Sequence, residues 1–267
     1  MTKRIALLTV AAIAYAVAAP ISRAQTPSGA QTLPDLSGVY YPVNAAGGGA
    51  RAGGAPPAPQ APPKPLPAPT RTAPLSDGSR GRSPDAPMLT PEYMKKWEAM
   101  RDSRIAGSSD SDNTAKCLPP GMPAMMNMAY GMEVMQTKDK ITFFSELNDA
   151  LRRVYLDGRK PTPAILDDPT YAGYSTGHWE GDTLVVETVS LRDNTYIEGF
   201  TPHSDQMTIR ERIRFVEPGI LEDRITVSDP KALVKPWETV KTYRKMTSPP
   251  EDQLREFACA EGIEHAR

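Results

Sequence analysis

The chain has 267 residues, and its 31 basic and 32 acidic side chains leave a formal net charge of −1 at pH 7. That balance lacks the basic surface that nucleic-acid-binding proteins need, so we expect no nucleic-acid partner. No Walker, GxGxxG or repeated zinc-type cysteine spacing appears in the sequence, and we expect no cofactor.

Residues 1–24 predict export. A basic start (MTKR) precedes the apolar run IALLTVAAIAYAVAA, and small residues follow at alternate positions, Ser22 and Ala24. This pattern is typical of a cleavable signal peptide and predicts a location in the periplasm or outside the cell. A membrane anchor is the alternative, but the run is short for a bilayer and no charged flank follows it. We therefore expect no membrane span after cleavage.

Residues 25–82 are predicted to form an N-terminal segment with little structure of its own. Its stretch at 44–69 consists mainly of Ala, Gly and Pro, which have almost nothing to bury. We expect a disordered linker there and a β-barrel domain over 83–267.

One helix and eight strands are predicted in the barrel domain. Thr90 can cap a helix at 91–104, in which Tyr93, Trp97 and Met100 form one apolar stripe. Short alternating segments with close turns then favour an antiparallel up-and-down meander that closes into a lipocalin-like barrel. These strands are expected at 131–137, 141–146, 150–157, 171–179, 183–190, 207–216, 220–228 and 237–245.

The two cysteines, Cys117 and Cys259, predict one disulfide. In an oxidising compartment an even number of cysteines usually pairs, and this pair would tie the start of the core to its C-terminal tail. A catalytic or metal-bound thiol is the alternative.

Two predicted strands each carry one carboxylate on an otherwise apolar face. In MTIRERIRF (207–215) the exception is Glu211, and in LEDRITV (221–227) it is Asp223. A three-residue loop ending at Gly219 would pair 213 with 223 and 211 with 225. Both carboxylates would then point to the same side, roughly 6–8 Å apart.

Two close carboxylates push their pKa values apart, which makes one a candidate general acid and the other a base. In an enzyme, Glu211 or His203 would be the base, Asp223 would tune it, and a cation would stabilise an oxyanion. As alternatives, an inward arginine, either Arg152 or Arg153, neutralises the carboxylates in a structural network, or a bulge lets Glu211 reach solvent. The predicted catalytic residues are Glu211, Asp223, His203, Tyr196, Arg153 and Lys241.

A long loop at 190–206 is typical of a lid or binding loop. Together with methionines clustered at 122–135, it predicts an adaptable apolar pocket. Zinc held by His178 and His203, or copper held by the methionines, are alternatives, but the spacing supports neither and no metal is expected. The predicted substrate-binding residues are Trp237, Tyr243, Phe215, Met132, Asn194 and His178.

Several motifs resemble a broad family of exported, largely uncharacterised bacterial proteins. The resemblance implies export and a lipocalin-like barrel, and it supplies no catalytic residues. The Pro/Ala/Gly-rich stretch departs from the family's usual pattern. The motifs are CLPPGMP (117–123), GHWEGDTLVVET (177–188), PHSD (202–205), DPKALVKPW (229–237) and, at the start of the mature chain, DLSGVYYP (35–42).

Three functions remain open from the sequence. The first is an enzyme that transforms a small apolar or aromatic molecule, such as a phenolic compound, by cofactor-free lyase or isomerase chemistry. Hydrolysis is disfavoured because no nucleophile motif is visible. The second is a periplasmic carrier of an apolar ligand, and the third is an envelope interaction protein that uses the Pro-rich segment. The oligomeric state is open, a homo-oligomer included.

Overall fold

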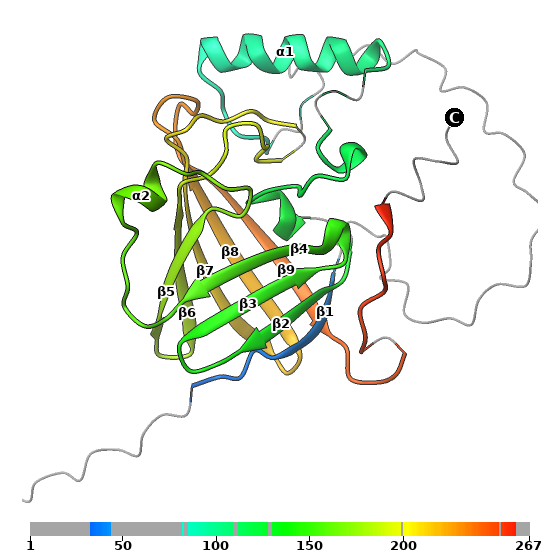
Figure 1. Ribbon diagram of the computed structural model, residues 1–267, viewed down its shortest axis with the longest axis vertical. Coiled ribbons are helices and arrows are strands. Elements are labelled where there is room, and N and C mark those ends of the chain that lie inside the picture. Colours follow the sequence, from blue (N-terminus) through cyan, green and yellow to red (C-terminus); the bar gives the residue numbers. More distant parts are fainter. Residues whose placement is uncertain are drawn as a thin grey trace, which may run out of the picture. The chain divides into compact units, whose positions relative to one another are not determined.

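The computed structural model describes residues 33–43, 82, 85–108, 110, 112–127, 130–198, 200–250 and 252–259. Nine strands in these ranges close into a barrel in which spatial order follows chain order (Figure 1). The predicted signal peptide at 1–24 and the stretch at 44–69 lie outside the described residues. The strands are β1 (Gly38–Pro42), β2 (Met132–Gln136), β3 (Lys140–Ser145), β4 (Ala150–Tyr155), β5 (Tyr174–Glu180), β6 (Thr183–Val189), β7 (Thr208–Glu217), β8 (Ile220–Ser228) and β9 (Trp237–Lys245).

All eight predicted strands are present, and the mainly β barrel is confirmed. The ninth strand, β1, was not predicted because GVYYP is short and is bounded by a glycine and a proline. It closes the barrel by pairing with β2 on one side and with β9 on the other.

The junction between β4 and β5 is parallel, whereas every other junction of the barrel is antiparallel. A ring of strictly alternating strands needs an even strand number, so nine strands force a parallel junction. The connection at 156–173, which contains the short helix α2 (Pro163–Leu166), carries the chain back to the starting end of β4. The expectation of an antiparallel meander is therefore wrong at this junction.

Inward-facing side chains fill the barrel interior. Alternate residues of each strand point inwards, and many of those on β3, β4, β6, β7 and β8 are at most 1% exposed. The interior is thus a packed core that includes charged groups. These inward residues are Phe143, Arg152, Val154, Leu184, Val186, Glu211, Ile213, Asp223 and Ile225.

The helix α1 (Pro91–Ile105) confirms the predicted packing helix, and its buried residues are Tyr93 and Trp97. Thr90 is its N-cap residue, but its hydroxyl donates to the Lys231 carbonyl at 3.1 Å rather than capping the helix. The remaining short helices are η1 (Thr114–Lys116), η2 (Ala124–Asn127) and η3 (Leu147–Asp149). No helix in the described part of the chain is long and apolar enough to cross a membrane.

The predicted disulfide between Cys117 and Cys259 is present. It links two positions 142 residues apart, just after η1 and in the C-terminal tail. Both cysteines are therefore occupied, and the alternative of a catalytic or metal-bound thiol does not apply.

Candidate functional site

The two predicted carboxylates both lie inside the barrel. Strands β7 and β8 pair Ile213 with Asp223 and Glu211 with Ile225, which is the predicted register. The predicted three-residue loop is wrong, because Glu217 pairs with Ile220 across a two-residue loop, and the bulge between Phe215 and Glu217 restores the register. Gly219 takes a left-handed conformation (φ 74°), and a bulge near Phe215 lies at the strand end, away from the carboxylates. Glu211 and Asp223 are both 0% exposed, so the bulge does not bring Glu211 to solvent.

Arg152 is the inward arginine that neutralises Glu211. Its Nη1 donates to one carboxylate oxygen of Glu211 at 2.8 Å, and its Nη2 donates to the other. The same guanidinium donates to Ser175 Oγ at 3.2 Å and to Thr188 Oγ1 at 2.9 Å. This fork geometry satisfies the buried ion pair, which a low-dielectric interior requires.

Arg153 was predicted as a catalytic cation beside Glu211, and that placement is wrong. Two readings of LRRVYLDG were possible because apolar residues flank both arginines. In the barrel, Arg152 shares the inner face with Ala150 and Val154, whereas Arg153 points outwards and is exposed. The pairing with β3 decides which arginine points inwards, because the buried Phe143 lies opposite Arg152.

Asp223 is a buried carboxyl without a hydrogen-bond partner among the described residues. Burial raises the pKa of Asp223 well above its ordinary value, and the nearby Glu211 raises it further. Arg152 and Lys241 lower it by less. The neutral form of Asp223 is therefore favoured, and the interior balances one guanidinium against one carboxylate.

Lys241 lies directly opposite Asp223 in the register of β8 and β9, but its ammonium group is 3.5 Å from Glu198 on the 190–206 loop. Tyr243, next along the inner face of β9, is buried, and its hydroxyl donates to the Met126 carbonyl. Burial, followed by the effect of Asp223, raises the pKa of Tyr243 well above its ordinary value. Both side chains thus have structural partners.

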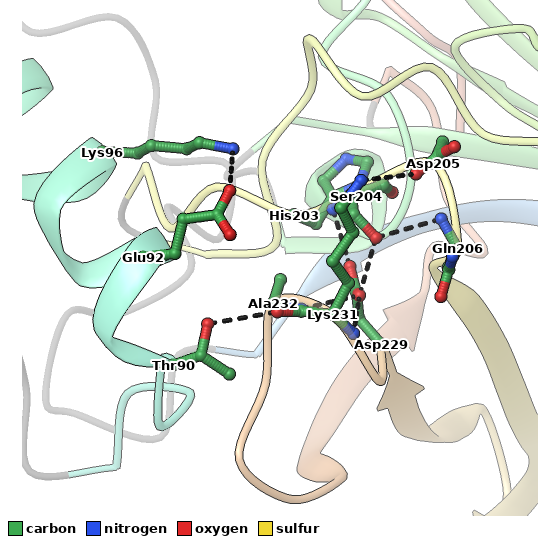
Figure 2. A network of polar contacts seen from close by, with 10 residues as sticks. All are labelled: Thr90, Glu92, Lys96, His203, Ser204, Asp205, Gln206, Asp229, Lys231 and Ala232. Atoms are coloured by element: carbon green, nitrogen blue, oxygen red, sulfur yellow. Dashed lines mark hydrogen bonds and ion pairs between the residues drawn. The ribbon is translucent and has the colours of Figure 1, made fainter.

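His203 belongs to a hydrogen-bonded loop network (Figure 2). Its Nδ1–H donates to the Ser204 carbonyl at 2.8 Å, and its Nε2 lies 2.7 Å from the Thr195 hydroxyl. The Ser204 hydroxyl donates to the Asp229 carboxylate at 2.7 Å, and this carboxylate also accepts a hydrogen bond from the backbone N–H of Ala232. Both ring nitrogens therefore have partners within the loop, and burial lowers the pKa of His203, which is only 3% exposed.

The other predicted site residues do not converge on one pocket. Tyr196 is half-buried against Phe200, with ring centroids 5.6 Å apart. Asn194 is exposed, and His178 is exposed on the outer face beside Glu180. No group of His, Cys, Asp and Glu in the described ranges could hold a metal ion. The predicted pocket residues Met132 and Tyr243 are core residues, while Phe215 and Trp237 pack partly buried against that core.

A groove of about 380 Å³ lies on the outside of the parallel junction. Strands β4 and β5 share only two residue pairs, Val154 with Ser175 and Tyr155 with Thr176. The start of β4 therefore separates from the segment at 170–174, and side chains line the gap. The lining residues are Pro119, Gly121, Met125, Asp149, Ala150, Leu151, Arg153, Tyr155, Thr170, Tyr171, Ala172, Gly173 and Tyr174.

Aromatic rings dominate the walls of this groove. Tyr155 and Tyr174 have ring centroids 5.3 Å apart, and the Arg192 guanidinium lies 4.9 Å from the ring centroid of Tyr171. Arg153 lies in the same wall, and no hydrogen bond or ion pair joins its side chain to another described residue. The groove thus combines flat apolar surfaces with an unpaired cation.

A second hollow, of about 390 Å³, lies at the β7–β8 turn. Its aromatic lining consists of Phe215 alone, and its charged residues are Glu217 and Lys245. The groove at the parallel junction offers three tyrosines and an unpaired arginine, so it is the stronger candidate for ligand binding.

The groove was not predicted from the sequence, although Arg153 was predicted as a site residue for another reason. Tyr155, Tyr171 and Tyr174 were visible near the ends of two predicted strands. Their convergence depends on the parallel junction, which no local pattern indicates.

No protein-family model matches the sequence. No curated protein matches it either. Among solved structures, the chain is similar to the crystal structure of the wild-type fluorescent protein UnaG, with 15% identity and a TM-score of 0.26 over 44% of this chain and 72% of that chain. A mutant of UnaG gives 14% identity and a TM-score of 0.27 over 51% of this chain and 87% of that chain. The barrel is assigned from its strand pairing, because structural similarities with TM-scores this low do not identify a fold.

Proposed function

We propose that the protein binds a small aromatic molecule in the groove between β4 and the segment at 170–174. The observation that carries this proposal is the convergence of Tyr155, Tyr171 and Tyr174 around a hollow of about 380 Å³. Small-molecule sites commonly measure about 300–1,000 Å³ and are lined by aromatic and apolar groups with a few polar ones. Stacking on tyrosine rings would supply affinity with little loss of side-chain entropy.

The geometry supports binding better than it supports the lyase or isomerase chemistry considered from the sequence. An acid or base must lie within hydrogen-bond reach of the substrate. Glu211, Asp223 and His203 are each at most 3% exposed and lie away from solvent. A ligand carrier is therefore the function that we favour.

We further propose that the protein acts after export, as the sequence predicts and as the resemblance to exported bacterial proteins implies. A disulfide such as Cys117–Cys259 suits an oxidising compartment. Fractionation of the native cells tests this part: recovery of the protein in the cytoplasm with its cysteines reduced would contradict it.

Binding is tested by calorimetric titration of the full mature chain with a panel of small phenols and aromatic acids. Tyr174→Leu is expected to weaken binding about 3–10-fold, which corresponds to the loss of one aromatic contact. Tyr130→Leu is the matched control, because Tyr130 is 41% exposed and does not line the groove. Equal losses in both variants, or no binding to the wild type, would contradict the proposal. Mass spectrometry of the recovered ligand separates a carrier, which leaves the mass unchanged, from an enzyme.

A further inference from the structure

We infer that the ligand of the groove is an aromatic carboxylic acid, held through its carboxylate by Arg153; this inference rests on the proposed function. Continuing the parallel register of Val154 with Ser175 by one residue places Arg153 beside Tyr174. Both residues line the groove, in which the guanidinium offers a planar fork of donors for a carboxylate and the tyrosine offers a flat surface for the ring that carries it.

Arg153 differs from the arginines around it in having no partner among the described residues. Arg152 is held by Glu211, and Arg159 pairs with Asp157. Arg192 donates to the Pro169 carbonyl. Because Arg153 is exposed in the groove and its side chain has no such partner, its guanidinium is available to bind an incoming anion.

Asp149 sets the orientation of the ligand. It lines the groove at the end of η3, directly before β4, and the three residue steps from Ala150 to Arg153 span roughly 10 Å at the rise of a β-strand. The side chain of Asp149 likewise makes no hydrogen bond or ion pair with another described residue. A carboxylate on the ligand is repelled at this end and attracted at the Arg153 end, while a hydroxyl on the ligand can donate to Asp149. The ligand class is therefore an elongated hydroxyaryl carboxylic acid.

The experiment compares 4-hydroxycinnamate with its methyl ester by calorimetry, using the full mature chain. The wild type is expected to bind the acid about tenfold more tightly than the ester, which equals about 1.4 kcal/mol. Arg153→Gln is expected to abolish this preference, so that the acid and the ester bind with equal affinity. Arg153→Lys keeps the charge but lacks the planar fork, so it is expected to keep only part of the preference. Arg210→Gln, an exposed arginine on β7, is the matched control.

The outcomes separate this inference from the proposed function. Equal binding of acid and ester by the wild type, with both weakened by Tyr174→Leu, would overturn the ligand class and leave the groove as the binding site. A preference for the acid that persists in Arg153→Gln would also overturn it. Binding of neither compound would count against the aromatic-binding proposal itself.

For Asp149, the expected result is that Asp149→Asn weakens the preference of the site for a free 4-hydroxyl over a 4-methoxy group.

Discussion

Two adjacent arginines of β4 show how differently the inside and the outside of this barrel use the same side chain. Arg152 is 1% exposed and is bonded to Glu211, Ser175 and Thr188. Arg153 is exposed in a tyrosine-lined groove and has no partner among the described residues. A satisfied buried charge serves the fold, whereas an unpaired charge in a hollow is available to a ligand. The candidate site therefore lies outside the barrel, at the junction where two strands are least paired.

The largest effect expected from this comparison is on the stability of the fold. Arg152→Met leaves the Glu211 carboxylate buried without its partner, and removal of one member of a buried pair costs about 3–5 kcal/mol in the free energy of unfolding. Urea denaturation of both proteins measures the difference. In the double variant Arg152→Met, Glu211→Leu, apolar packing replaces the pair, and most of the lost stability is expected to return. A loss below about 1 kcal/mol in the single variant would show that the interior does not depend on this pair.

Replacement of Asp223 by a neutral side chain is expected to stabilise the folded protein. Because the folded pKa of Asp223 is raised, the folded protein keeps a proton that the unfolded chain loses above about pH 4. Stability is therefore lost as pH rises through this window, by up to about 1.4 kcal/mol per pH unit. Asp223→Asn mimics the neutral carboxyl and is expected to stabilise the protein by about 1–3 kcal/mol at pH 7. Urea midpoints at pH 4, 5.5 and 7 measure the slope, and an unchanged slope in the variant would rule out Asp223 as its source.

His203 is expected to produce a smaller effect of the opposite sign. Its pKa is lowered by burial, so the unfolded chain takes up a proton below about pH 6.5 that the folded protein does not. Stability is therefore lost as pH falls below that value, by at most about 1 kcal/mol over the first pH unit. His203→Gln removes this dependence, whereas the exposed His178→Gln is the control that retains it. Parallel pH profiles of His203→Gln and the wild type would show that the loop network does not titrate.

Much of the barrel could be predicted from the sequence, because eight strands have clear alternation and close turns. The shared face of Glu211 and Asp223 was predicted from a three-residue loop, whereas the structure reaches the same register with a two-residue loop and a bulge between Phe215 and Glu217. The choice between Arg152 and Arg153 could not be made, since both have apolar residues at alternate positions.

The groove could not be predicted because it depends on the number of strands. Eight strands can close a barrel with antiparallel junctions throughout, and the short strand β1 makes the number nine. The ninth strand imposes a parallel junction, and the two residue pairs of that junction leave the gap that Tyr155 and Tyr174 line. The candidate site thus depends on the one strand that the sequence pattern did not reveal.

The smallest stability effect is expected from the same substitution at the neighbouring position, Arg153→Met. Arg153 gives up no ion pair with a described residue, and its aliphatic stem is replaced by another flexible chain, so the free energy of unfolding should change by no more than about 0.5 kcal/mol. Urea denaturation, run beside Arg152→Met, measures this directly. A loss above about 1 kcal/mol would mean that Arg153 already has a structural partner. The cation would then not be available to a ligand, and the contrast between the two arginines would fail.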